Sequence, residues 1–345
     1  MDNIRTHDDN DMSSRLKGQL ALKVAVLIPC YNEAITIAQV VRDFRAALPD
    51  AIVYVYDNNS ADDTVKEAVL AGAVVRREYQ QGKGHVVRRM FRDLDADFYV
   101  MTDGDNTYDA GIAQDMLTLA MNGPFDLVNC IRQETEVAAY RNGHRAGNYL
   151  LSGAVRLIFG GRLEDMLSGY KVLSRRFVKS FPALSSGFDI ETELAVHALE
   201  ISMPIANMDG AYRGRPPLSQ SKLRTYRDGL RILRLILKLV RHERPVMFFG
   251  FFAALLFIAA FVLIGPVIVT YIDTGLVPRL PTAVLSMGLT TLACLSFMTG
   301  VILDTVTRGR RELRLLSYLQ YAAPPYAGRS SWPMDSVTQT TRGSI

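Results

Sequence analysis

The sequence predicts an α/β domain with a mostly parallel, Rossmann-like sheet, followed by an amphipathic helix at a membrane surface and a two-helix transmembrane hairpin. Three observations lead to this fold class. Over about the first two hundred residues, short apolar runs alternate with helical patterns, which is typical of a sheet covered on both faces. Two uncharged apolar segments, 246–272 and 280–303, each exceed the ~20 residues that cross a ~30 Å hydrocarbon core. Before them lies a basic segment whose apolar residues recur at steps of three and four.

Five short apolar runs are predicted to form the strands, and a helical pattern follows each of the first four. In chain order the predicted strands are 23–29, 51–57, 72–78, 97–103 and 126–131, with helices around 35–48, 63–71, 84–94 and 111–122. Ligands of such sheets bind beyond the carboxyl ends of the strands. The polar stretches PCYNEA, DNNSADDT and DGDNTYD follow the first, second and fourth strands, so we expect them to share one edge of the sheet.

The two apolar segments predict a hairpin whose ends face the cytosol. A buried core helix is the alternative for either segment alone, but the short connection 273–279 favours a membrane hairpin. Excess Lys and Arg stay on the cytoplasmic side of a membrane. Basic residues crowd before the first span and after the second: Arg231, Arg234, Lys238, Arg241, Arg244, Arg308, Arg310, Arg311 and Arg314. We therefore expect an integral protein of the plasma or inner membrane, with two spans and with its N-terminal domain and both termini in the cytosol.

These patterns divide the chain into five parts. Residues 1–20 are polar with no apolar run, which predicts a disordered arm and no signal peptide. The α/β domain is expected over 21–220, the amphipathic juxtamembrane helix over 221–244, the hairpin over 245–305, and a cytosolic basic helix with a disordered tail over 306–345. Three widely spaced cysteines indicate reduced thiols, and a net charge of +4 gives no support to nucleic-acid binding.

The stretch YVMTDGDNTYDA places three carboxylates, Asp103, Asp105 and Asp109, directly behind a predicted strand. A solvated acidic turn is the alternative, and the two other polar turns predicted at the same edge argue against it. In an extended segment Asp103 and Asp105 point the same way, and Mg²⁺ commonly bridges one or two carboxylates to substrate phosphates. The pattern therefore predicts a site for Mg²⁺ or Mn²⁺ that carries a diphosphate. A dinucleotide-binding turn is not expected, because IPCYNEA contains no glycine and QGKGHVV contains only a Gly-x-Gly.

An ordered set of motifs resembles the family 2 glycosyltransferases with a GT-A fold. The resemblance rests on VLIPCYNEA, DNNSADDT, GKGHVV and the Asp-x-Asp of MTDGDNTYD, and continues in EDMLSGYKVLSRR, GFDIETELAVHA and YRGRPPLSQSKLRTYRDGLRIL. With two spans behind them, the later segments are similar to the polyprenyl-phosphate glycosyltransferases, a branch that includes the dolichyl-phosphate mannose synthases and bacterial undecaprenyl-phosphate sugar transferases. The resemblance covers about residues 24–314. It implies an inverting, metal-dependent transfer from a nucleoside-diphosphate sugar, with a UDP-hexose favoured and GDP-mannose second, to a polyprenyl phosphate.

The resemblance also implies roles for individual positions. Asp103 and Asp105 would bind the metal and Arg132 would face the donor sugar and phosphates, so these three are the candidate catalytic residues. The nucleotide would be bound by Pro29, Tyr31, Glu33, Asp57, Lys83 and again Asp103. The acceptor phosphate would meet Arg213, Ser221 and Lys222 at the membrane surface. Sugar or acceptor contacts would come from Asp165, Asp189 and Glu191.

Two positions depart from the family pattern. Many relatives carry two acids after the second strand, where this chain has Asp57 followed by Asn58. Mannose synthases often carry Gln two residues after the second Asp of the metal motif, and here Thr107 stands in that place. The first departure leaves the bound base open, and the second leaves the third metal ligand open.

Two other functions are alternatives to lipid-linked sugar transfer. A processive polysaccharide synthase would carry a Gln-x-x-Arg-Trp motif, but the one tryptophan is Trp332 in the polar tail and two spans are too few for a polymer channel. A non-catalytic membrane adaptor could keep a nucleotide-sugar fold, although the intact Asp103 and Asp105 argue against it. The expected partners are the donor, the lipid acceptor and the bilayer, with a homo-oligomer, such as a tetramer, as a further expectation.

Overall fold

The computed structural model describes residues 22–134, 153, 164–183, 187, 190–214, 234, 237–238 and 240–324. The chain divides into two compact units. The sheet unit comprises the described residues within 1–140, 163–221 and 318–345, and the hairpin unit those within 141–162 and 222–317. The predicted arm at 1–20, most of the predicted amphipathic helix at 221–244 and the tail from residue 325 onward lie outside the described residues.

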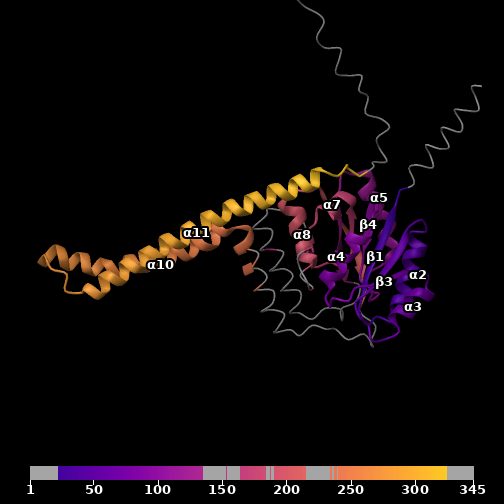
Figure 1. The fold of residues 1–345 in the computed structure, drawn as a ribbon, viewed down its shortest axis with the longest axis horizontal. Coiled ribbons are helices and arrows are strands. Elements are labelled where there is room, and N and C mark those ends of the chain that lie inside the picture. Colours follow the sequence, from indigo (N-terminus) through magenta and orange to yellow (C-terminus); the bar gives the residue numbers. More distant parts are fainter. Residues whose placement is uncertain are drawn as a thin grey trace, which may run out of the picture. The chain divides into compact units, whose positions relative to one another are not determined.

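The sheet unit contains a seven-stranded sheet in the order β3-β2-β1-β4-β6-β5-β7 (Figure 1). The strands are β1 (Val24–Cys30), β2 (Ile52–Asp57), β3 (Val74–Arg77), β4 (Phe98–Met101), β5 (Leu127–Glu134), β6 (Lys171–Ser174) and β7 (Ile205–Tyr212). Every neighbouring pair is parallel except the pairs that β6 forms with β4 and β5. The mostly parallel sheet predicted from the sequence is therefore confirmed.

Strands β6 and β7 lie beyond the five strands predicted from the sequence. β6 has only four residues, KVLS, and all four are buried, so no alternation of apolar and polar residues marks it. β7 reads IANMDGAY, in which Asp209 and Gly210 interrupt the apolar pattern. Both are defined by their partners: β6 lies between β4 and β5, and β7 pairs with β5 along its whole length.

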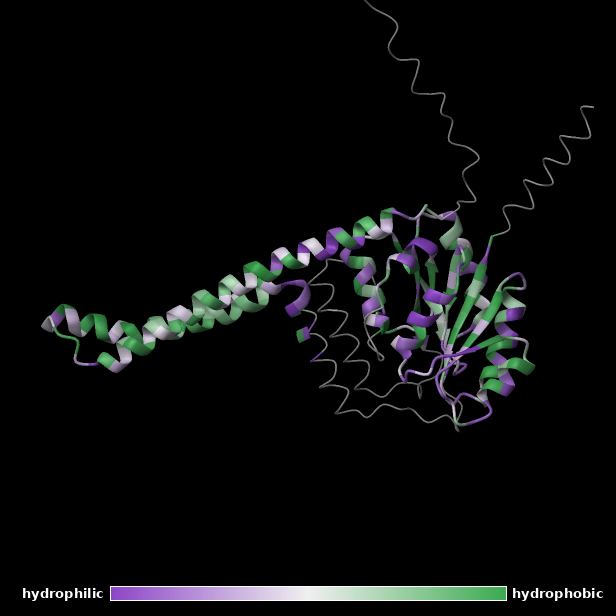
Figure 2. Cartoon of the chain, viewed as in Figure 1, coloured by the Kyte–Doolittle hydropathy of each residue, from purple (hydrophilic) through white to green (hydrophobic). Residues whose placement is uncertain are grey.

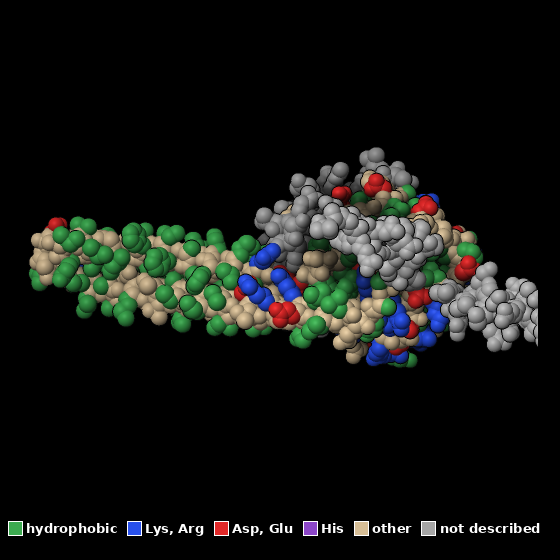
Figure 3. All heavy atoms as spheres, turned by 90° about the horizontal axis from the view of Figure 1, so that it is seen from above, with side chains coloured by type: hydrophobic (Ala, Val, Ile, Leu, Met, Phe, Trp, Pro, Cys, Tyr) green, Lys and Arg blue, Asp and Glu red, His purple; other side chains and the backbone are tan. Residues whose placement is uncertain are grey.

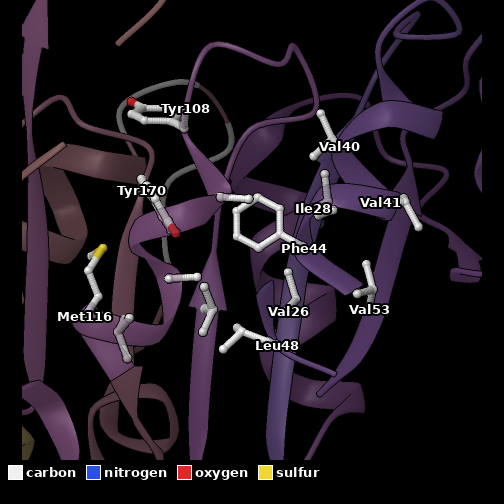
Figure 4. Packing of buried hydrophobic residues seen from close by; sticks show 14 of the residues in the cluster. Val26, Ile28, Val40, Val41, Phe44, Leu48, Val53, Tyr108, Met116 and Tyr170 are labelled. Atoms are coloured by element: carbon white, nitrogen blue, oxygen red, sulfur yellow. The ribbon is translucent and has the colours of Figure 1, made fainter. Parts of the chain in front are cut away.

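Amphipathic helices connect these strands and supply the rest of the core. The helices of the sheet unit are α2 (Ile37–Ala47), α3 (Thr64–Leu70), α4 (Lys83–Asp93), the 3-10 turn η1 (Ala110–Ile112), α5 (Ala113–Asn122), α7 (Arg175–Ser180) and α8 (Ile190–Glu200). In α2 the buried residues are spaced as i, i+3, i+4 and i+7, so they form one face; they are Ile37, Val40, Val41 and Phe44. That face packs on β1, where Figure 4 shows Phe44 between Ile28 and Tyr170.

The hairpin unit contains two long apolar helices, α10 (Pro245–Thr274) and α11 (Leu280–Leu319, whose last two residues fall in the sheet unit). Both are long and apolar enough to cross a membrane, by length and composition. Figure 2 shows α10 as mostly hydrophobic, whereas α11 is hydrophobic over its first part and carries hydrophilic residues toward its C-terminal end. Gly275 ends α10 with a φ of 70°, a left-handed conformation that favours glycine. α11 continues well past the apolar segment predicted to end at residue 303, so the basic residues that follow that segment lie on the same helix.

Small side chains lie between the two helices of the hairpin, and large ones lie outside. The buried positions recur every seven residues, as Ala253, Ala260 and Val267 on α10 and as Ser286, Ala293, Gly300 and Thr307 on α11. A Cβ at Gly300 would come within 3.1 Å of Phe249 Cβ, so the helix backbones approach closely there. Two hydroxyls donate across the seam, Ser286 Oγ to Ala260 O (2.9 Å) and Ser296 Oγ to Phe249 O (3.0 Å). Large apolar side chains cover the outer surface (Figure 3), an arrangement typical of helices that pack in a membrane.

Candidate functional site

At the carboxyl ends of β1, β2 and β4, three polar turns are joined by hydrogen bonds. Asn32 Oδ1 accepts from the Ala61 N–H (2.8 Å), and the Asn32 N–H donates to Ser60 Oγ (2.9 Å). Thr36 Oγ1 donates to the carbonyl oxygen of Gly104 (2.6 Å), which links the turn after β1 to the acidic turn after β4. The structure therefore brings the three polar stretches to one edge of the sheet, as the order of the strands predicted.

Three of the predicted nucleotide-binding residues lie at the end of β1 or on the turn that follows it. Pro29 is partly buried and pairs with Tyr56 of β2. Tyr31 is 36% exposed. Glu33 is partly buried, and its N–H donates to Thr64 Oγ1 (2.8 Å), which fixes the backbone of the turn.

Asp57 and Asn58 are neighbours at the end of β2, but their side chains make different kinds of contact. Asp57 is buried, accepts from the Ser60 N–H (3.2 Å) and lies 3.7 Å from Arg77 Nε. Asn58 holds the segment 78–82: its Nδ2 donates to the carbonyl oxygens of Glu78 (2.9 Å) and Gln80 (2.8 Å), and its Oδ1 accepts from the Gly82 N–H (2.7 Å). An aspartate at 58 would place a carboxylate against two carbonyl oxygens. The departure from the two-acid pattern is therefore a structural requirement of this loop.

Asp103 and Asp105 have different surroundings in the acidic turn after β4. Asp103 Oδ1 accepts from Lys83 Nζ at 2.5 Å, and a Cβ at Gly169 would come within 2.3 Å of Asp103 Oδ2, so this carboxylate lies directly against the backbone at 169. Asp105 is buried, and its Oδ1 accepts from Thr107 Oγ1 (2.6 Å) and from the Thr107 N–H (3.3 Å). Thr107, the second departure from the family pattern, thus orients the second carboxylate of the motif.

Lys83, at the start of α4, binds two carboxylates that come from different parts of the chain. Besides Asp103, its Nζ contacts Oε1 of Glu191, in the first turn of α8. Burial by itself would lower the pKa of Lys83, but the charges of Asp103 and Glu191 and the hydrogen bonds to them raise it above its ordinary value. Lys83 is therefore a permanent cation of the site. Glu191 binds this lysine, and its role as a sugar or acceptor contact stays a prediction.

Arg132 and Asp165, predicted separately, form a bidentate ion pair. Arg132 Nε donates to Asp165 Oδ2 (2.7 Å) and Nη2 to Oδ1 (2.6 Å), while the Arg132 N–H also reaches Oδ2 (3.1 Å). Burial would raise the pKa of Asp165, but the hydrogen bonds and charge of Arg132 hold it below its ordinary value. The guanidinium also lies over the ring of Tyr212, 5.4 Å from its centroid. Arg132 is thus held rigidly from two sides.

Lys171 and Asn129 support this pair and were missed by the sequence reasoning. Lys171, the first residue of β6, is fully buried, and its Nζ donates to Asn129 Oδ1 (2.5 Å). Asn129 Nδ2 in turn donates to the carbonyl oxygen of Glu164 (2.7 Å), next to Asp165. Burial lowers the pKa of Lys171 to about 8. The one available signal in the sequence was a lysine inside the otherwise apolar run YKVL. A single lysine in such a run is usually a surface residue, and only the position of β6 between β4 and β5 shows that this one is buried.

The residues predicted for the acceptor phosphate are only partly described. Arg213 follows β7, is exposed, and its Nη2 lies 3.8 Å from Asp109 Oδ1. The Arg213 N–H donates to the carbonyl oxygen of Thr107 (2.9 Å), so its backbone is tied to the acidic turn. Ser221 and Lys222, as well as Asp189 among the predicted sugar contacts, lie outside the described residues.

Comparisons with known proteins agree with the fold and the motifs. The model of the glycosyl transferase family 2 matches residues 25–180. Protein RfbJ of Shigella flexneri is 49% identical over 126 residues, which are 36% of this chain and 98% of RfbJ. Glycosyltransferase AglJ of Haloferax volcanii is 34% identical over 228 residues, which are 66% of this chain and 75% of AglJ.

A solved structure shares the fold of the sheet unit. It is glucosyl-3-phosphoglycerate synthase from Mycobacterium tuberculosis, in complex with Mn²⁺, UDP-glucose and glycerol 3-phosphate. The TM-score is 0.53 at 21% identity, over 65% of this chain and 81% of the synthase. This likeness confirms the GT-A fold predicted from the motifs. Together with the match of the family model and the identity to AglJ over most of its length, it leads to one assignment: the chain belongs to glycosyl transferase family 2.

Proposed function

We propose that this protein is an inverting, metal-dependent glycosyltransferase that moves a sugar from a nucleoside-diphosphate sugar to a polyprenyl phosphate at the cytosolic face of a membrane. A UDP-hexose is the favoured donor, and GDP-mannose is the second. The observation that carries this proposal is the hairpin: a family 2 domain shares its chain with two helices that turn small residues inward and large apolar residues outward. The five-part division of the chain given by the sequence belongs to the same proposal.

The outer surface of the hairpin supports a membrane location. Phe251, Phe257 and Phe261 are 62%, 55% and 70% exposed. In water, each exposed Å² of apolar surface would cost roughly 25 cal/mol, whereas lipid tails remove that cost. A lipid-linked acceptor gives a family 2 domain a reason to carry such helices, because substrate and enzyme then share one membrane.

The acidic turn suits a divalent ion that is shared with a diphosphate. Within the described ranges, no three His, Cys, Asp or Glu side chains form a group that could hold a metal ion. The protein would therefore contribute Asp103 and Asp105, and the donor diphosphate would supply further oxygens, as is usual for Mg²⁺. When bound, the ion would neutralise negative charge on the departing nucleoside diphosphate. The Mn²⁺ and UDP-glucose in the synthase of the same fold support this part of the proposal.

The residues of the chain would position the reactants for one displacement. A phosphate oxygen of the acceptor forms the bond to the anomeric carbon, while the bond from that carbon to the β-phosphate oxygen breaks, which inverts the centre. The acceptor phosphate is already largely anionic at neutral pH, with a second pKa near ~6, so it needs orientation more than a general base. Arg132, held by Asp165 and Tyr212, would face the donor, and Arg213, Ser221 and Lys222 would bind the acceptor phosphate.

The test is transfer from labelled UDP- and GDP-sugars to undecaprenyl phosphate by the full chain in detergent, with Mn²⁺ or Mg²⁺ compared with EDTA. We expect one donor to label the lipid only when metal is present. Asp105→Asn should reduce the rate by at least ~100-fold, the scale seen when one preorganised charge interaction is removed. Asp115→Asn is the matched control, because Asp115 is an exposed acid on α5 and is not one of the two proposed metal ligands, so its loss should leave the rate unchanged.

Two negative results of this assay would have different meanings. Nucleotide binding without transfer to the lipid would overturn the acceptor and leave a glycosyltransferase with another substrate. Loss of both nucleotide binding and transfer would favour the non-catalytic adaptor.

A further inference from the structure

Lys83 lies between two acids that the chain brings together from far apart. Its Nζ is 2.5 Å from Oδ1 of Asp103, in the turn after β4, and also contacts Oε1 of Glu191 on α8. The three side chains are only 13%, 28% and 7% exposed, respectively. Water therefore screens these charges poorly, and Lys83 is paired with both acids.

The carboxylate of Asp103 can bind either of two cations. Asp103 Oδ1 binds the ammonium of Lys83, and Asp103 is also one of the two acids proposed to hold the divalent ion. Asp103, Asp105 and Glu191 with Lys83 make three carboxylates and one ammonium, a formal charge of −2. A divalent ion would neutralise that cluster, but it would have to share or take the oxygen that Lys83 occupies.

We propose that Lys83 competes with the divalent ion for Asp103, and that Glu191 is the positioning residue that keeps Lys83 when the ion binds. This inference rests on the proposed function, because it concerns the same metal site. Without Lys83, the partly buried Asp103 and the buried Glu191 would repel each other. With Glu191 beside it, Lys83 can leave Asp103 and still remain paired, so the exchange exposes no unpaired buried charge.

The test measures Mn²⁺ binding to the full chain in detergent without nucleotide. The electron paramagnetic resonance signal of free Mn²⁺ reports how much of the ion remains unbound. Lys83→Met should tighten Mn²⁺ binding about 3- to 10-fold, because the competing cation is gone. Lys83→Arg should stay within about twofold of the wild type. Glu191→Gln should weaken binding about 3- to 10-fold, because Lys83 then pairs with Asp103 alone. Glu200→Gln removes the same charge at the other end of α8 and should leave the affinity for Mn²⁺ unchanged.

A double mutant separates competition from a general effect of charge. In an Asp103→Asn background, Lys83→Met should no longer tighten Mn²⁺ binding, because the carboxylate charge for which the two cations compete is absent. Persistence of the effect in that background, or unchanged binding in Lys83→Met, would overturn the inference. Because Glu191→Gln predicts the opposite sign, poor folding of one variant cannot imitate the expected pattern.

The outcome also separates this inference from the proposed function. If the wild type binds Mn²⁺ but the variants do not follow the order Lys83→Met, wild type, Glu191→Gln from tight to weak, only the role of Lys83 fails. If the wild type binds no Mn²⁺ either alone or with a UDP-sugar, the metal site of the proposed function fails with it.

Discussion

In the sheet unit the largest side chains are the most deeply buried, whereas in the hairpin the buried positions carry mainly small ones. Tyr56, Tyr99 and Phe44 are at most 1% exposed in the sheet unit. In the hairpin, Ala260 and Ala293 are 3% exposed, while Phe261 is 70% exposed. Water drives large apolar groups inward in the first unit. In the second, the helices approach closely through small residues, which is the arrangement expected where lipid replaces water.

The two units also treat buried polar groups differently. In the sheet unit a charged side chain, Lys171, is buried against a single amide oxygen, that of Asn129, beside the ion pair of Arg132 and Asp165. In the hairpin unit Ser286 Oγ donates to the backbone carbonyl of Ala260 on the facing helix, and the buried Glu243, just before α10, is paired with Arg311. The sheet unit thus buries a charge near the candidate site, whereas the buried charge of the hairpin unit lies outside its apolar segments.

The largest effect is expected from removing a large side chain on the inside of the sheet unit. Phe44→Ala should lower the free energy of unfolding by about 3–5 kcal/mol, because it leaves a cavity beside Tyr170. Phe257→Ala removes the same ring from the outside of the hairpin, where it is 55% exposed, and should cost less than about 0.5 kcal/mol. Hydrogen exchange of the amides of β1 and of α10 in detergent would measure both. Equal losses would show that the outer face of the hairpin is a packed protein surface.

The next effect concerns the buried charge of Lys171. Its pKa is lowered in the folded protein, from an ordinary value of 10.5 to about 8, so between these pH values the unfolded chain binds the extra proton. Stability of the sheet unit should therefore rise with pH over this window, by up to about 3 kcal/mol at ~1.4 kcal/mol per pKa unit. In Lys171→Met this rise should be absent. Urea unfolding at pH 7.5, 9 and 10.5 measures it, and parallel pH profiles of the two proteins would contradict the prediction.

The seam of the hairpin should tolerate added volume far less than its outer face. Gly300→Leu should destabilise the pairing of α10 and α11 by about 1–3 kcal/mol, because a Cβ there already meets Phe249 and the backbone at Pro245 and Val246. Gly288→Leu is the matched control on the same helix, since nothing lies within 4 Å of a Cβ at Gly288. Energy transfer between labels on the two helices, during titration with denaturing detergent, would report the difference. Equal effects would mean that the seam is not closely packed.

The smallest effect is expected from one hydroxyl of the seam. Ser286→Ala removes the hydrogen bond to the Ala260 carbonyl and should cost about 0.6 kcal/mol, the average for such bonds between membrane helices. Thr291→Ala provides the control, because its hydroxyl donates to Met287 O of its own helix. The same energy-transfer titration applies. If Ser286→Ala reduced the free energy of helix pairing by several kcal/mol, the contribution of this hydrogen bond would not be the one expected between membrane helices.

Local patterns were enough to predict much of this protein. The apolar run before Pro29, the helical face of α2 and the two uncharged spans each depend on residues close in sequence, and all appear in the structure. The reasoning failed for β6 and β7, because short strands with a buried lysine or an internal glycine carry no alternating pattern. It also left the contact between Glu191 and Lys83 unpredicted, because nothing in the sequence shows that α8 reaches Lys83.

The sequence by itself determined the alternation of strands and helices, the order of the polar turns at one sheet edge, the family and the two apolar helices, because each follows from local periodicity or from motifs. Only the tertiary structure decided that Asn58 holds the loop before α4, that Asp165 pairs with Arg132, and that Lys83 is shared by Asp103 and Glu191. These contacts join residues between 20 and 108 positions apart in the sequence. Strand register and helix packing determine which of many possible partners meet, and neither is encoded in the residue types of any one segment.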